Sequence, residues 1–482
     1  MSFTKTLTNQ THTINGAAAF TSTNSAVLDL FSMGVSSKDK EELIANAFGE
    51  DPILAIKAAI YLRDVREGQG NRDIFRSLIN SLLDLTDEDN NLDKDVGKLI
   101  LIIFTHTAEF GRWKDIIEFI PQLPSKLKTA VFEFLSVNLS DGLLCKWLPR
   151  QGLIAKEFAN YLKLSHGDYR RKIVANSKTV EQQMCAREWG AINYSHVPSI
   201  ANHKYNAAFL KNDTARRKAF LEKAVKGEVK INSSVLYPHT IYAMLERARV
   251  GNKMYSDNTA ANALWAQLPN YMTNASNVLP IIDTSGSMFC RATGTTSECI
   301  DIAAGLGIYF ATHNTGSYKN LWMNFSTTPK AYYLKGETLT DYANSLDYNN
   351  WAGTTDLDKA MEFVLKAAIK APEDAPKTII IVSDMEFNGC TRYTSHDKMK
   401  QLFAEANIEM PVIIFWRVNV SIKQQPVTMN EKGVILINGY SPVVLKEILS
   451  GDMKNYSPYN AMLKVIEPKY PWVNEAFTLS AK

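Results

Sequence analysis

The sequence is poor in cysteine. Its 482 residues include five cysteines, an odd number, and no two of them form a C-x-x-C pair. Neither the number nor the spacing indicates a disulfide framework. We therefore expect free thiols in a reducing cytoplasm.

Long apolar runs are also missing. The longest dense one, Leu99 to Phe104, is far shorter than the ~20 residues that cross a bilayer. The N-terminal sequence MSFTKTLTNQTHT has no apolar signal core. We therefore expect no contact with a membrane. A chain that is 45% hydrophobic, with ordinary glycine and proline, is instead typical of a globular protein of two or more domains.

The net charge of the whole chain is only +3, but the charge is unevenly distributed. Residues 146–250 hold 19 Lys/Arg and 8 Asp/Glu, a net charge of +11, whereas residues 1–145 carry −6 and residues 251–482 carry −2. A local positive excess of this size indicates a polyanionic partner. The alternative is a solvated helical surface that the acidic N-terminal block balances in space.

The first half of the chain has a helical rhythm. Between about residues 37 and 250, apolar residues recur at intervals of three and four, as in DPILAIKAAIYLRDVREG, residues 51–68. Glycine, proline or polar residues separate these short segments. We predict an all-α helical-repeat domain over residues 1–270, HEAT-like and arranged as a ring or solenoid.

The second half alternates short β-rich runs with helical stretches. The runs include NVLPIID (277–283), TIIIVSD (378–384) and PVIIFWRV (411–418). Continuous apolar strands between helices are typical of a doubly wound, Rossmann-like sheet that is mostly parallel. We predict such a domain over residues 271–482. Ligands of these sheets bind beyond the carboxyl ends of the strands, where Asp283 and Asp384 lie.

The stretch DTSGS, residues 283–287, follows the first of these strands. An aspartic protease would need two aspartates that share a proton, each in its own Asp-Thr/Ser-Gly turn. The chain contains no second such turn, although a homodimer would supply one. A metal site fits the stretch better, because a single loop offers the carboxylate of Asp283 and the hydroxyls of Ser285 and Ser287.

Further oxygen ligands come from two later loops. Thr354 and Thr355 precede a helix, and Asp384 ends another apolar strand. Few carboxylates with several neutral oxygens suit Mg²⁺ or Mn²⁺. Cysteine and histidine are absent from these loops, which argues against zinc.

This order of motifs resembles the metal-ion-dependent adhesion site of von Willebrand factor A domains. The resemblance assigns the site to five residues: Asp283, Ser285, Ser287, Thr354 and Asp384. It implies that these residues hold the ion directly or through water, and that a partner's carboxylate fills an open coordination position. The family's Gly-Gly-Thr is Ala352-Gly353-Thr354 here, so Thr355 stays an alternative to Thr354.

A helical array followed by an A domain resembles the Ro autoantigen family, whose TROVE module is a ring of helical repeats closed by an A domain. VLYPHTIYAMLE, residues 235–246, is similar to the helix that leads toward the A domain in that family. EFGRWKDIIEFI (109–120) and CKWLPRQG (145–152) more closely resemble a related family of uncharacterised prokaryotic, plant and viral proteins. The Ro resemblance implies binding of small noncoding RNAs and of single-stranded 3′ ends of misfolded RNAs.

The basic block supplies the residues that we expect to contact RNA phosphates. They are Lys146, Arg150, Arg170, Arg171, Lys172, Arg216, Arg217 and Lys218. His203 and Lys204, beside Tyr205, form a candidate stacking site for an unpaired base. We interpret Trp147 and Tyr205 as core residues more readily than as stacking platforms. Outside the block, Arg63, Arg66 and Arg72 alternate with acidic residues around a Gly-Gln-Gly turn, and we interpret them mainly as an ion-pair network between repeats.

Enzyme motifs are missing. The sequence has no Gly-x-x-x-x-Gly-Lys loop, no Gly-x-Ser-x-Gly elbow and no His-Glu-x-x-His. We predict a non-enzymatic RNA-binding protein whose Mg²⁺-dependent A domain closes the ring. One alternative is a metal-dependent protein-interaction module, in which the A domain binds an acidic group of a partner and the helices are a scaffold. Another is a metal-dependent hydrolase acting at Asp283.

Overall fold

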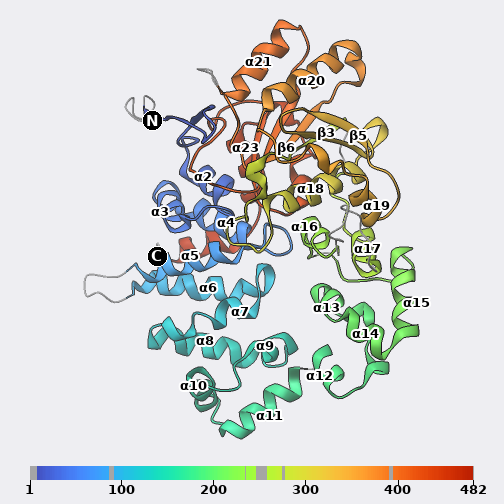
Figure 1. Ribbon diagram of the computed structural model, residues 1–482. Coiled ribbons are helices and arrows are strands. Elements are labelled where there is room, and N and C mark those ends of the chain that lie inside the picture. Colours follow the sequence, from blue (N-terminus) through green and yellow to red (C-terminus); the bar gives the residue numbers. More distant parts are fainter. Residues whose placement is uncertain are drawn as a thin grey trace.

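The computed structural model describes residues 8–85, 92–177, 179–233, 235–245, 258–273, 277–389 and 394–480 (Figure 1). A run of helices occupies most of the chain before residue 270, and a six-stranded sheet with helices on both faces follows. The predicted fold class is confirmed. Within the described ranges, no helix is both long enough and apolar enough to cross a membrane.

Helices of the first region begin at polar caps, as α4 (Pro52–Arg63) shows. The Asp51 side chain accepts a hydrogen bond from the backbone N–H of Leu54, and Pro52 lies in the first turn, where a missing N–H costs nothing. The other helices of this region are α2 (Ala26–Met33), α3 (Lys40–Glu50), α5 (Arg72–Leu83), α6 (Lys94–Phe110), α7 (Trp113–Ile117), α8 (Ser125–Val137), α9 (Gly142–Trp147), α10 (Leu153–Tyr161), α11 (His166–Ser177), α12 (Val180–Cys185), α13 (Ser199–Lys204), α14 (Asn206–Asn212), α15 (Thr214–Val225), α16 (Pro238–Tyr242) and α17 (Thr259–Ala266).

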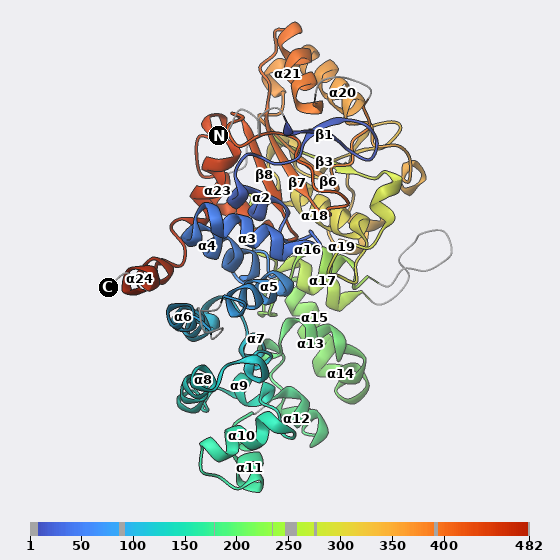
Figure 2. The ribbon, with the colours of Figure 1, turned by 90° about the vertical axis from the view of Figure 1, so that its left-hand side faces the viewer.

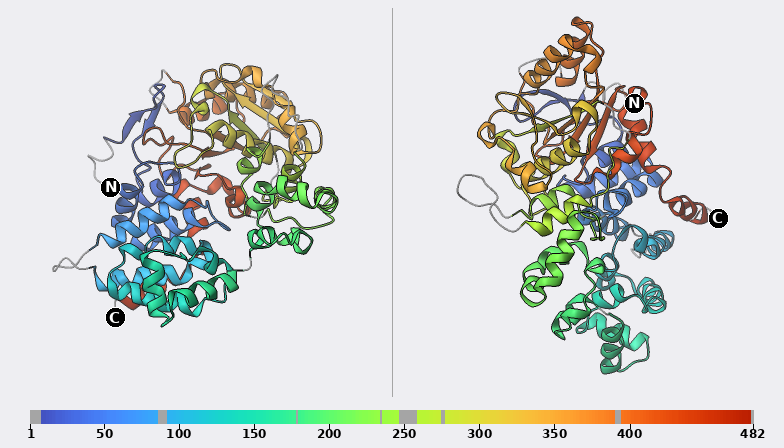
Figure 3. Two further views of the ribbon diagram at one scale, coloured as in Figure 1. Left: turned by 60° about the horizontal axis from the view of Figure 1, so that its bottom comes forward. Right: turned by 90° about the vertical axis from the view of Figure 1, so that its right-hand side faces the viewer.

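These helices trace an arc, which we call the helical arc. It leaves the sheet region near α5 and α6, descends through α8 to α11, and climbs back through α13 to α15 (Figure 1). It rejoins the sheet region at α16 and α17, which contact α18 (Cys299–His313) and α19 (Leu339–Asn344). Arc and sheet region together therefore form a ring, seen from another side in Figure 3.

Apart from the exposed edge strand β5, the sheet is buried on both faces. Its strand order is β5-β4-β3-β6-β7-β8, and all neighbours are parallel except β5, which pairs antiparallel with β4. Alternate residues face opposite cores: Ile281 packs with α20 and α21, whereas Ile282 joins the large core that continues into the helical arc. The strands are β3 (Val278–Asp283), β4 (Leu321–Phe325), β5 (Lys330–Tyr333), β6 (Thr378–Ser383), β7 (Val412–Arg417) and β8 (Val434–Asn438). The remaining helices are α20 (Leu357–Lys370), α21 (Ser395–Glu405), α22 (Leu445–Ile448), α23 (Pro458–Ile466) and α24 (Pro471–Ser480).

Both ends of the described chain cross the predicted boundary at residue 270. The hairpin of β1 (Gln10–His12) and β2 (Ala18–Phe20) lies on the sheet region, where Gly16 and Phe20 form bridges with Asn388 and Gln425 (Figure 2). At the other end, α24 packs on α4 and α6 of the helical arc. Each region therefore contains a segment from the opposite end of the sequence.

The Gly-Gln-Gly turn joins the helical arc to the sheet region. The side-chain oxygen of Gln69 accepts hydrogen bonds of 2.9 Å from the backbone N–H groups of Tyr440 and Ser441. Next to it, Arg63 forms the predicted ion pair between helices, with Asp115 of α7. Arg66 differs from the prediction, because its guanidinium donates to a backbone carbonyl, that of Glu109.

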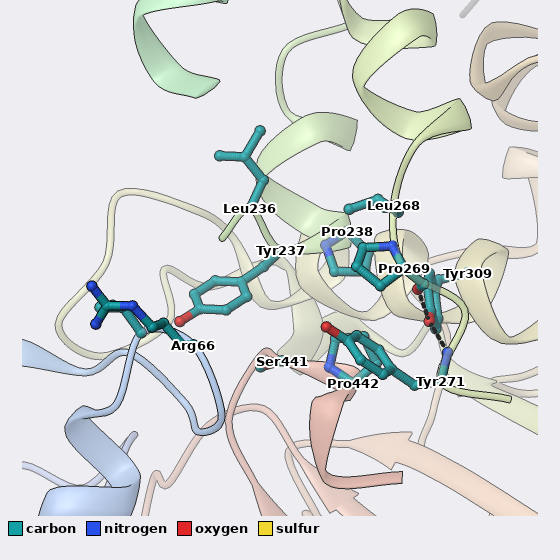
Figure 4. A pocket seen from close by; sticks show the side chains of 11 residues that line it. Arg66, Leu236, Tyr237, Pro238, Leu268, Pro269, Tyr271, Tyr309, Ser441 and Pro442 are labelled. Carbon is teal, nitrogen blue, oxygen red and sulfur yellow. Dashed lines mark hydrogen bonds between the residues drawn. The ribbon is translucent and has the colours of Figure 1, made fainter. Parts of the chain in front are cut away.

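The returning end of the helical arc meets the sheet region at tyrosines and prolines (Figure 4). The hydroxyl of Tyr309 donates to the carbonyl of Pro269 at 2.6 Å and accepts from the backbone N–H of Tyr271 at 2.9 Å. Arg66 and Ser441 line the same small cavity. The two ends of the helical arc and the loop after β8 thus come together at one junction.

Candidate metal centre and nucleic-acid interface

The candidate metal centre lies where the strand order reverses. β3 and β6 are neighbours in the middle of the sheet, and later strands add on either side of them. β3 ends at Asp283, and β6 ends at Ser383, immediately before Asp384. Because the two strands are parallel, their carboxyl ends meet at one edge. Doubly wound sheets bind their ligands at this position.

The loop after β3 turns its hydroxyl groups back over Asp283. The backbone N–H of Ser285 donates to Oδ1 of Asp283 at 2.9 Å, and the Oγ atoms of Ser285 and Ser287 lie 3.2 Å apart. Aspartate favours such a turn because its side chain accepts a hydrogen bond from the backbone two residues later. The N–H of Gly286 also donates to the carbonyl of Gly353 at 2.9 Å, which joins this loop to the predicted threonine loop.

Both carboxylates of the centre are buried, Asp283 being 0% and Asp384 1% exposed. The Oγ of Ser383 donates to Oδ2 of Asp283 at 2.6 Å. The backbone N–H of Glu386 donates to Oδ1 of Asp384 at 3.2 Å. Among the hydrogen bonds of the described residues, none involves Oδ2 of Asp384. A buried carboxylate oxygen without a partner is unfavourable, so this atom calls for a ligand.

The pKa values of the two carboxyl groups reflect this burial. The pKa of Asp283 rises to about 7, first because the group is buried and then because the charge of Asp384 is near. Burial also raises the pKa of Asp384, against hydrogen bonds from Glu386 and Ser287. Two adjacent buried carboxylates favour a proton or a cation between them at neutral pH.

These donors fit a hard divalent cation. Asp283 and Asp384 offer carboxylates, and Ser285 and Ser287 offer neutral hydroxyls, all at one edge of the sheet. Two carboxylates with neutral oxygens suit Mg²⁺ or Mn²⁺ that keeps bound waters. In the described part of the chain, no three His, Cys, Asp or Glu side chains form a metal-binding group. Because the atoms that these four residues offer are all oxygens, they suit such a cation better than zinc.

The predicted threonine lies at the margin of this cluster. Thr354 is exposed, and its hydroxyl is 3.4 Å from that of Thr327. Thr355 is 2% exposed. Ala352, which stands where the A-domain pattern has its first glycine, has a φ of 66°, in the left-handed region. Four predicted ligands thus come together, and the threonine loop lies beside them through Gly353.

The two histidines of the sheet region contact other groups than the serines. His313 stacks on Tyr309 with ring centroids 4.2 Å apart, and its Nδ1 is 3.0 Å from the carbonyl of that tyrosine. His396 is 2% exposed and packs against Phe415. These contacts give no support to a histidine base for a serine nucleophile.

The groups that surround Asp384 were not among the predicted site residues. Glu386 is buried, and its Oε2 accepts a hydrogen bond of 2.8 Å from the backbone N–H of Ile14, in the N-terminal hairpin. Arg417, at the end of β7, is 3% exposed, and burial lowers its pKa to about 10. Ser383 was visible in the sequence as a hydroxyl at a strand end, whereas no local pattern linked Ile14 to this site.

The second predicted site is the basic surface of the helical arc, most of which is exposed. Arg150, Arg170, Arg171 and Lys172 are exposed, the last three being consecutive on α11. Lys218 of α15 is exposed as well. Three of the predicted residues form ion pairs: Lys146 with Glu181 at 2.9 Å, Arg171 with Asp168 at 2.5 Å and Arg216 with Asp213 at 2.6 Å.

The prediction that Arg217 contacts RNA is wrong, because its guanidinium lies in the interior of the protein. The side chain is 0% exposed and lies 5.0 Å from the ring of Tyr194 and 5.2 Å from that of Phe209. It donates to the side-chain oxygens of Asn202 and Asn206 at 3.0 Å each. Burial lowers its pKa to about 10. Arg217 therefore holds together the small core of α12 to α15 and does not face RNA.

The candidate stacking residues and the neighbouring aromatic residues differ in their exposure to solvent. His203 and Lys204 are exposed and line a hollow at the return of the helical arc. Tyr205 is half-buried, packs on Phe209 at 6.3 Å and donates to Glu181 at 3.3 Å, as expected of a core residue. Trp147 is 40% exposed, with the ammonium of Lys114 5.6 Å from its ring, so it is not the core residue that we had favoured.

Comparisons with protein families divide the chain close to the change in sequence rhythm. Residues 13–133 and 149–277, more than half of the chain, match the model of a family described as "Domain of unknown function (DUF2828)". Residues 277–467 match a second model, described as "Domain of unknown function (DUF7788)".

Similar proteins cover nearly the whole chain. "Uncharacterized protein L728" of Acanthamoeba polyphaga mimivirus is 25% identical, over 96% of this chain and 88% of that protein. A viral relative agrees with the predicted resemblance to an uncharacterised family. The solved structure titled "Crystal structure of Deinococcus radiodurans RO (RSR) protein" aligns with 92% of this chain and 93% of that chain, at a TM-score of 0.37 and 12% identity. So loose an alignment carries no argument about function, and RNA binding stays a prediction.

Proposed function

We propose that this chain, which belongs to the DUF2828 family of domains of unknown function, is a non-enzymatic RNA-binding protein whose sheet region holds a divalent cation. The helical arc takes the RNA backbone. The sheet region closes the ring and presents the cation to an acidic group of a partner. Both proposed activities are binding events: the helical arc offers an exposed basic surface, and the sheet region offers a ligand set for a cation.

The exposed basic residues of α11 carry the RNA proposal. Arg170, Arg171 and Lys172 follow one another at the end of the helical arc that is farthest from the sheet region (Figure 1). Among these three residues, Arg171 forms an ion pair with the exposed Asp168. Phosphate groups need Lys or Arg without sequence readout, so an exposed surface of this charge suits an RNA backbone.

The observation that supports the cation proposal is the buried Oδ2 of Asp384, which has no hydrogen-bond partner among the described residues. A divalent cation at this point would neutralise two buried carboxylates and leave a coordination position for an acidic ligand. The protein's own residues fix the ligand set: Ser383 orients Asp283, and the N–H of Glu386 orients Asp384. Ser285 and Ser287 add hydroxyl oxygens without further charge.

One observation favours the alternative, a metal-dependent protein-interaction module. Phe289, two residues after Ser287, is 42% exposed, and its ring centroid lies 6.4 Å from that of the half-buried Trp351. Exposed aromatic side chains beside a cation site would favour an acidic protein segment with an apolar neighbour. In that case the cation site binds a protein and the helical arc is a scaffold.

The RNA proposal is tested with a fluorescein-labelled single-stranded RNA and the triple variant R170E/R171E/K172E. Fluorescence anisotropy over a range of salt concentrations should give at least about a 10-fold loss of affinity. The slope of log K against log salt should also fall by about 2, because each phosphate contact to a single strand contributes about 0.7.

The matched control reverses three exposed lysines of the sheet region, K366E/K370E/K377E. It changes the net charge by the same amount, so equal losses in both variants would mean that only overall charge matters. RNA binding that the α11 variant leaves unchanged would overturn the RNA proposal. It would leave the protein-interaction module as the function to pursue.

The cation proposal is tested by calorimetric titration of the metal-free protein with Mn²⁺. We expect one site per chain, with an affinity that falls more than about 100-fold in Asp384→Asn. The control Asp374→Asn removes an exposed carboxylate of the same region and should bind Mn²⁺ normally. No Mn²⁺ heat in the intact protein, or equal heat in both variants, would contradict the proposal.

A further inference from the structure

Two cysteines lie side by side next to the candidate metal centre. Cys290 follows the loop after β3 that carries Ser285 and Ser287. Cys299 is the first residue of α18. The segment between them folds back on itself, with an antiparallel bridge between Arg291 and Glu298. The N–H of Cys299 donates to the carbonyl of Cys290 at 2.9 Å. This backbone pairing brings the two sulfur atoms to 3.7 Å.

The two thiols differ in access to solvent. Cys290 is exposed, whereas Cys299 is buried at 0%. The Sγ of Cys290 also accepts a contact of 3.6 Å from the side-chain amide of Asn419. An exposed thiol held against a buried one has the arrangement of an attacking and a resolving cysteine. Cys145 differs, because it is buried and its thiol donates to the carbonyl of Leu139.

We propose that Cys290 and Cys299 are a peroxide-sensitive dithiol that closes reversibly to an intramolecular disulfide. Their sulfurs must approach from 3.7 Å to a bond length of about 2.05 Å. The antiparallel pairing already holds the two backbones together, so rotation of the exposed Cys290 side chain supplies most of that movement. No other pair of described cysteines is in contact.

The oxidation balances with hydrogen peroxide as the oxidant. The Cys290 thiolate attacks one peroxide oxygen, an S–O bond forms, the O–O bond breaks and hydroxide leaves, which gives a sulfenic acid. The Cys299 sulfur then attacks the Cys290 sulfur, the S–O bond breaks, and the hydroxyl leaves with the Cys299 proton as water. The hydroxide takes up the proton that the Cys290 thiol released when it ionised, so two waters are formed in all. Two electrons pass from the two sulfur atoms to the peroxide. A dithiol reductant reverses the reaction.

The disulfide would fix a loop that touches both regions of the protein. Residues Gly294 to Ser297 line one side of a hollow whose other side is α16 of the helical arc. A Cβ atom on Gly294 would lie 3.0 Å from the carboxylate of Asp73, in α5. Oxidation at Cys290 and Cys299 would therefore stiffen the contact between the segment that joins the two cysteines and the helical arc.

The sequence suits a direct test, because trypsin separates the two cysteines. Cleavage after Arg291 places Cys290 in the peptide Met254–Arg291 and Cys299 in the peptide Ala292–Lys319, and neither contains another cysteine. The full-length protein is treated with hydrogen peroxide, blocked with N-ethylmaleimide, denatured and digested without reductant. Mass spectrometry should detect the two peptides joined by a disulfide in the monomer band, and separate after reduction.

Two variants sharpen the result. In Cys299→Ser the linked pair should vanish and dimedone should label Cys290, because the sulfenic acid then has no resolving thiol. In Cys185→Ser, which removes the exposed cysteine of α12, the linked pair should form as in the intact protein. N-ethylmaleimide marks thiols that have stayed reduced. If both Cys290 and Cys299 carry it after a peroxide dose that oxidises Cys185, the proposal is overturned. A linked pair confined to covalent dimers would overturn it as well.

Discussion

The hydroxyl of Ser383 donates a 2.6 Å hydrogen bond to Oδ2 of Asp283, across the two neighbouring strands at the centre of the sheet. The other oxygen, Oδ1, accepts from the N–H of Ser285. The orientation of this carboxylate is therefore fixed from both sides. A group that orients a metal ligand in this way contributes to affinity without touching the ion.

Replacing Ser383 by alanine should accordingly weaken Mn²⁺ binding by about 10-fold, because Asp283 loses the bond that holds its second oxygen. The measurement is a calorimetric titration of the metal-free variant. Ser345→Ala is the control, since the Ser345 hydroxyl donates to a nearby backbone carbonyl of its own helix end. An unchanged affinity in Ser383→Ala would mean that Asp283 is not a ligand or needs no orientation.

Arg217 should matter for stability and not for RNA. Arg217→Leu removes its hydrogen bonds to Asn202 and Asn206 and leaves those groups buried without their partner. We expect a loss of about 2–4 kcal/mol in the free energy of unfolding, measured by urea denaturation. Lys218→Ala, next to it but exposed, should change stability by less than about 0.5 kcal/mol. A stable Arg217→Leu protein with weakened RNA binding would restore Arg217 as a contact.

His239 should lower the stability of the protein as the pH falls below the ordinary range of histidine. The raised pKa of Asp283 acts in the opposite direction, because the folded chain takes up that proton before the unfolded chain does. His239 is buried between Tyr237 and Tyr440, and burial lowers its pKa from 6.5 to about 3. Between these values the unfolded chain binds a proton that the folded chain does not. The free energy of unfolding therefore decreases with falling pH, by up to about 1.4 kcal/mol per pH unit from this group.

Urea denaturation at several pH values between 7.5 and 5 measures this slope, where about 1.4 kcal/mol per unit is the limit for one proton. His239→Gln cannot take up the proton, so its slope should be flatter. His396, whose pKa burial lowers to about 4, keeps part of the dependence in that variant. His166→Gln changes an exposed histidine and serves as the control. Equal slopes in the intact protein and in His239→Gln would show that His239 takes no part.

Ala352→Gly should stabilise the protein. Alanine at a φ of 66° carries a cost of about 1–2 kcal/mol that glycine avoids, and the greater freedom of glycine in the unfolded chain offsets about 0.4–1 kcal/mol of the gain. We expect a net increase of about 0.5 kcal/mol in the free energy of unfolding. Ala367→Gly, the same substitution at an exposed position of α20, should instead cost about 1 kcal/mol. A loss of stability in both variants would contradict the strain at Ala352.

Much of the sheet region could be predicted, because its strands are buried on both faces and therefore read as continuous apolar runs. TIIIVSD contains β6 and NVLPIID contains β3, and a parallel sheet brings their ends together whatever the rest of the chain does. The convergence of the four candidate ligands follows from that geometry. The N-terminal hairpin could not be predicted, because strands of three residues have too little pattern and the sheet-region residues that the hairpin contacts lie more than 360 residues away.

The basic surface was harder to predict, because the charge of a side chain does not reveal whether it faces the solvent or the core. Arg216, Arg217 and Lys218 are consecutive on α15, so the helix must point them to different sides. The sequence did not say which side was inward. The rings of Tyr194 and Phe209 settle it, and neither residue belongs to α15. A similar limit applies to Trp147, whose exposure depends on how α9 packs.

The hydrogen bonds of the N-terminal hairpin also constrain the order in which the parts of the protein fold. Thr13 donates to the carbonyl of Phe387 across 374 positions of sequence, and Ile14 donates to Glu386 across 372. During synthesis these first residues leave the ribosome long before β6 exists, so they must wait with their hydrogen-bonding groups in water. Closing so long a loop carries a large entropic cost and slows folding. The buried environment of Asp384 is therefore completed late, after translation has passed well beyond the sheet's third parallel strand.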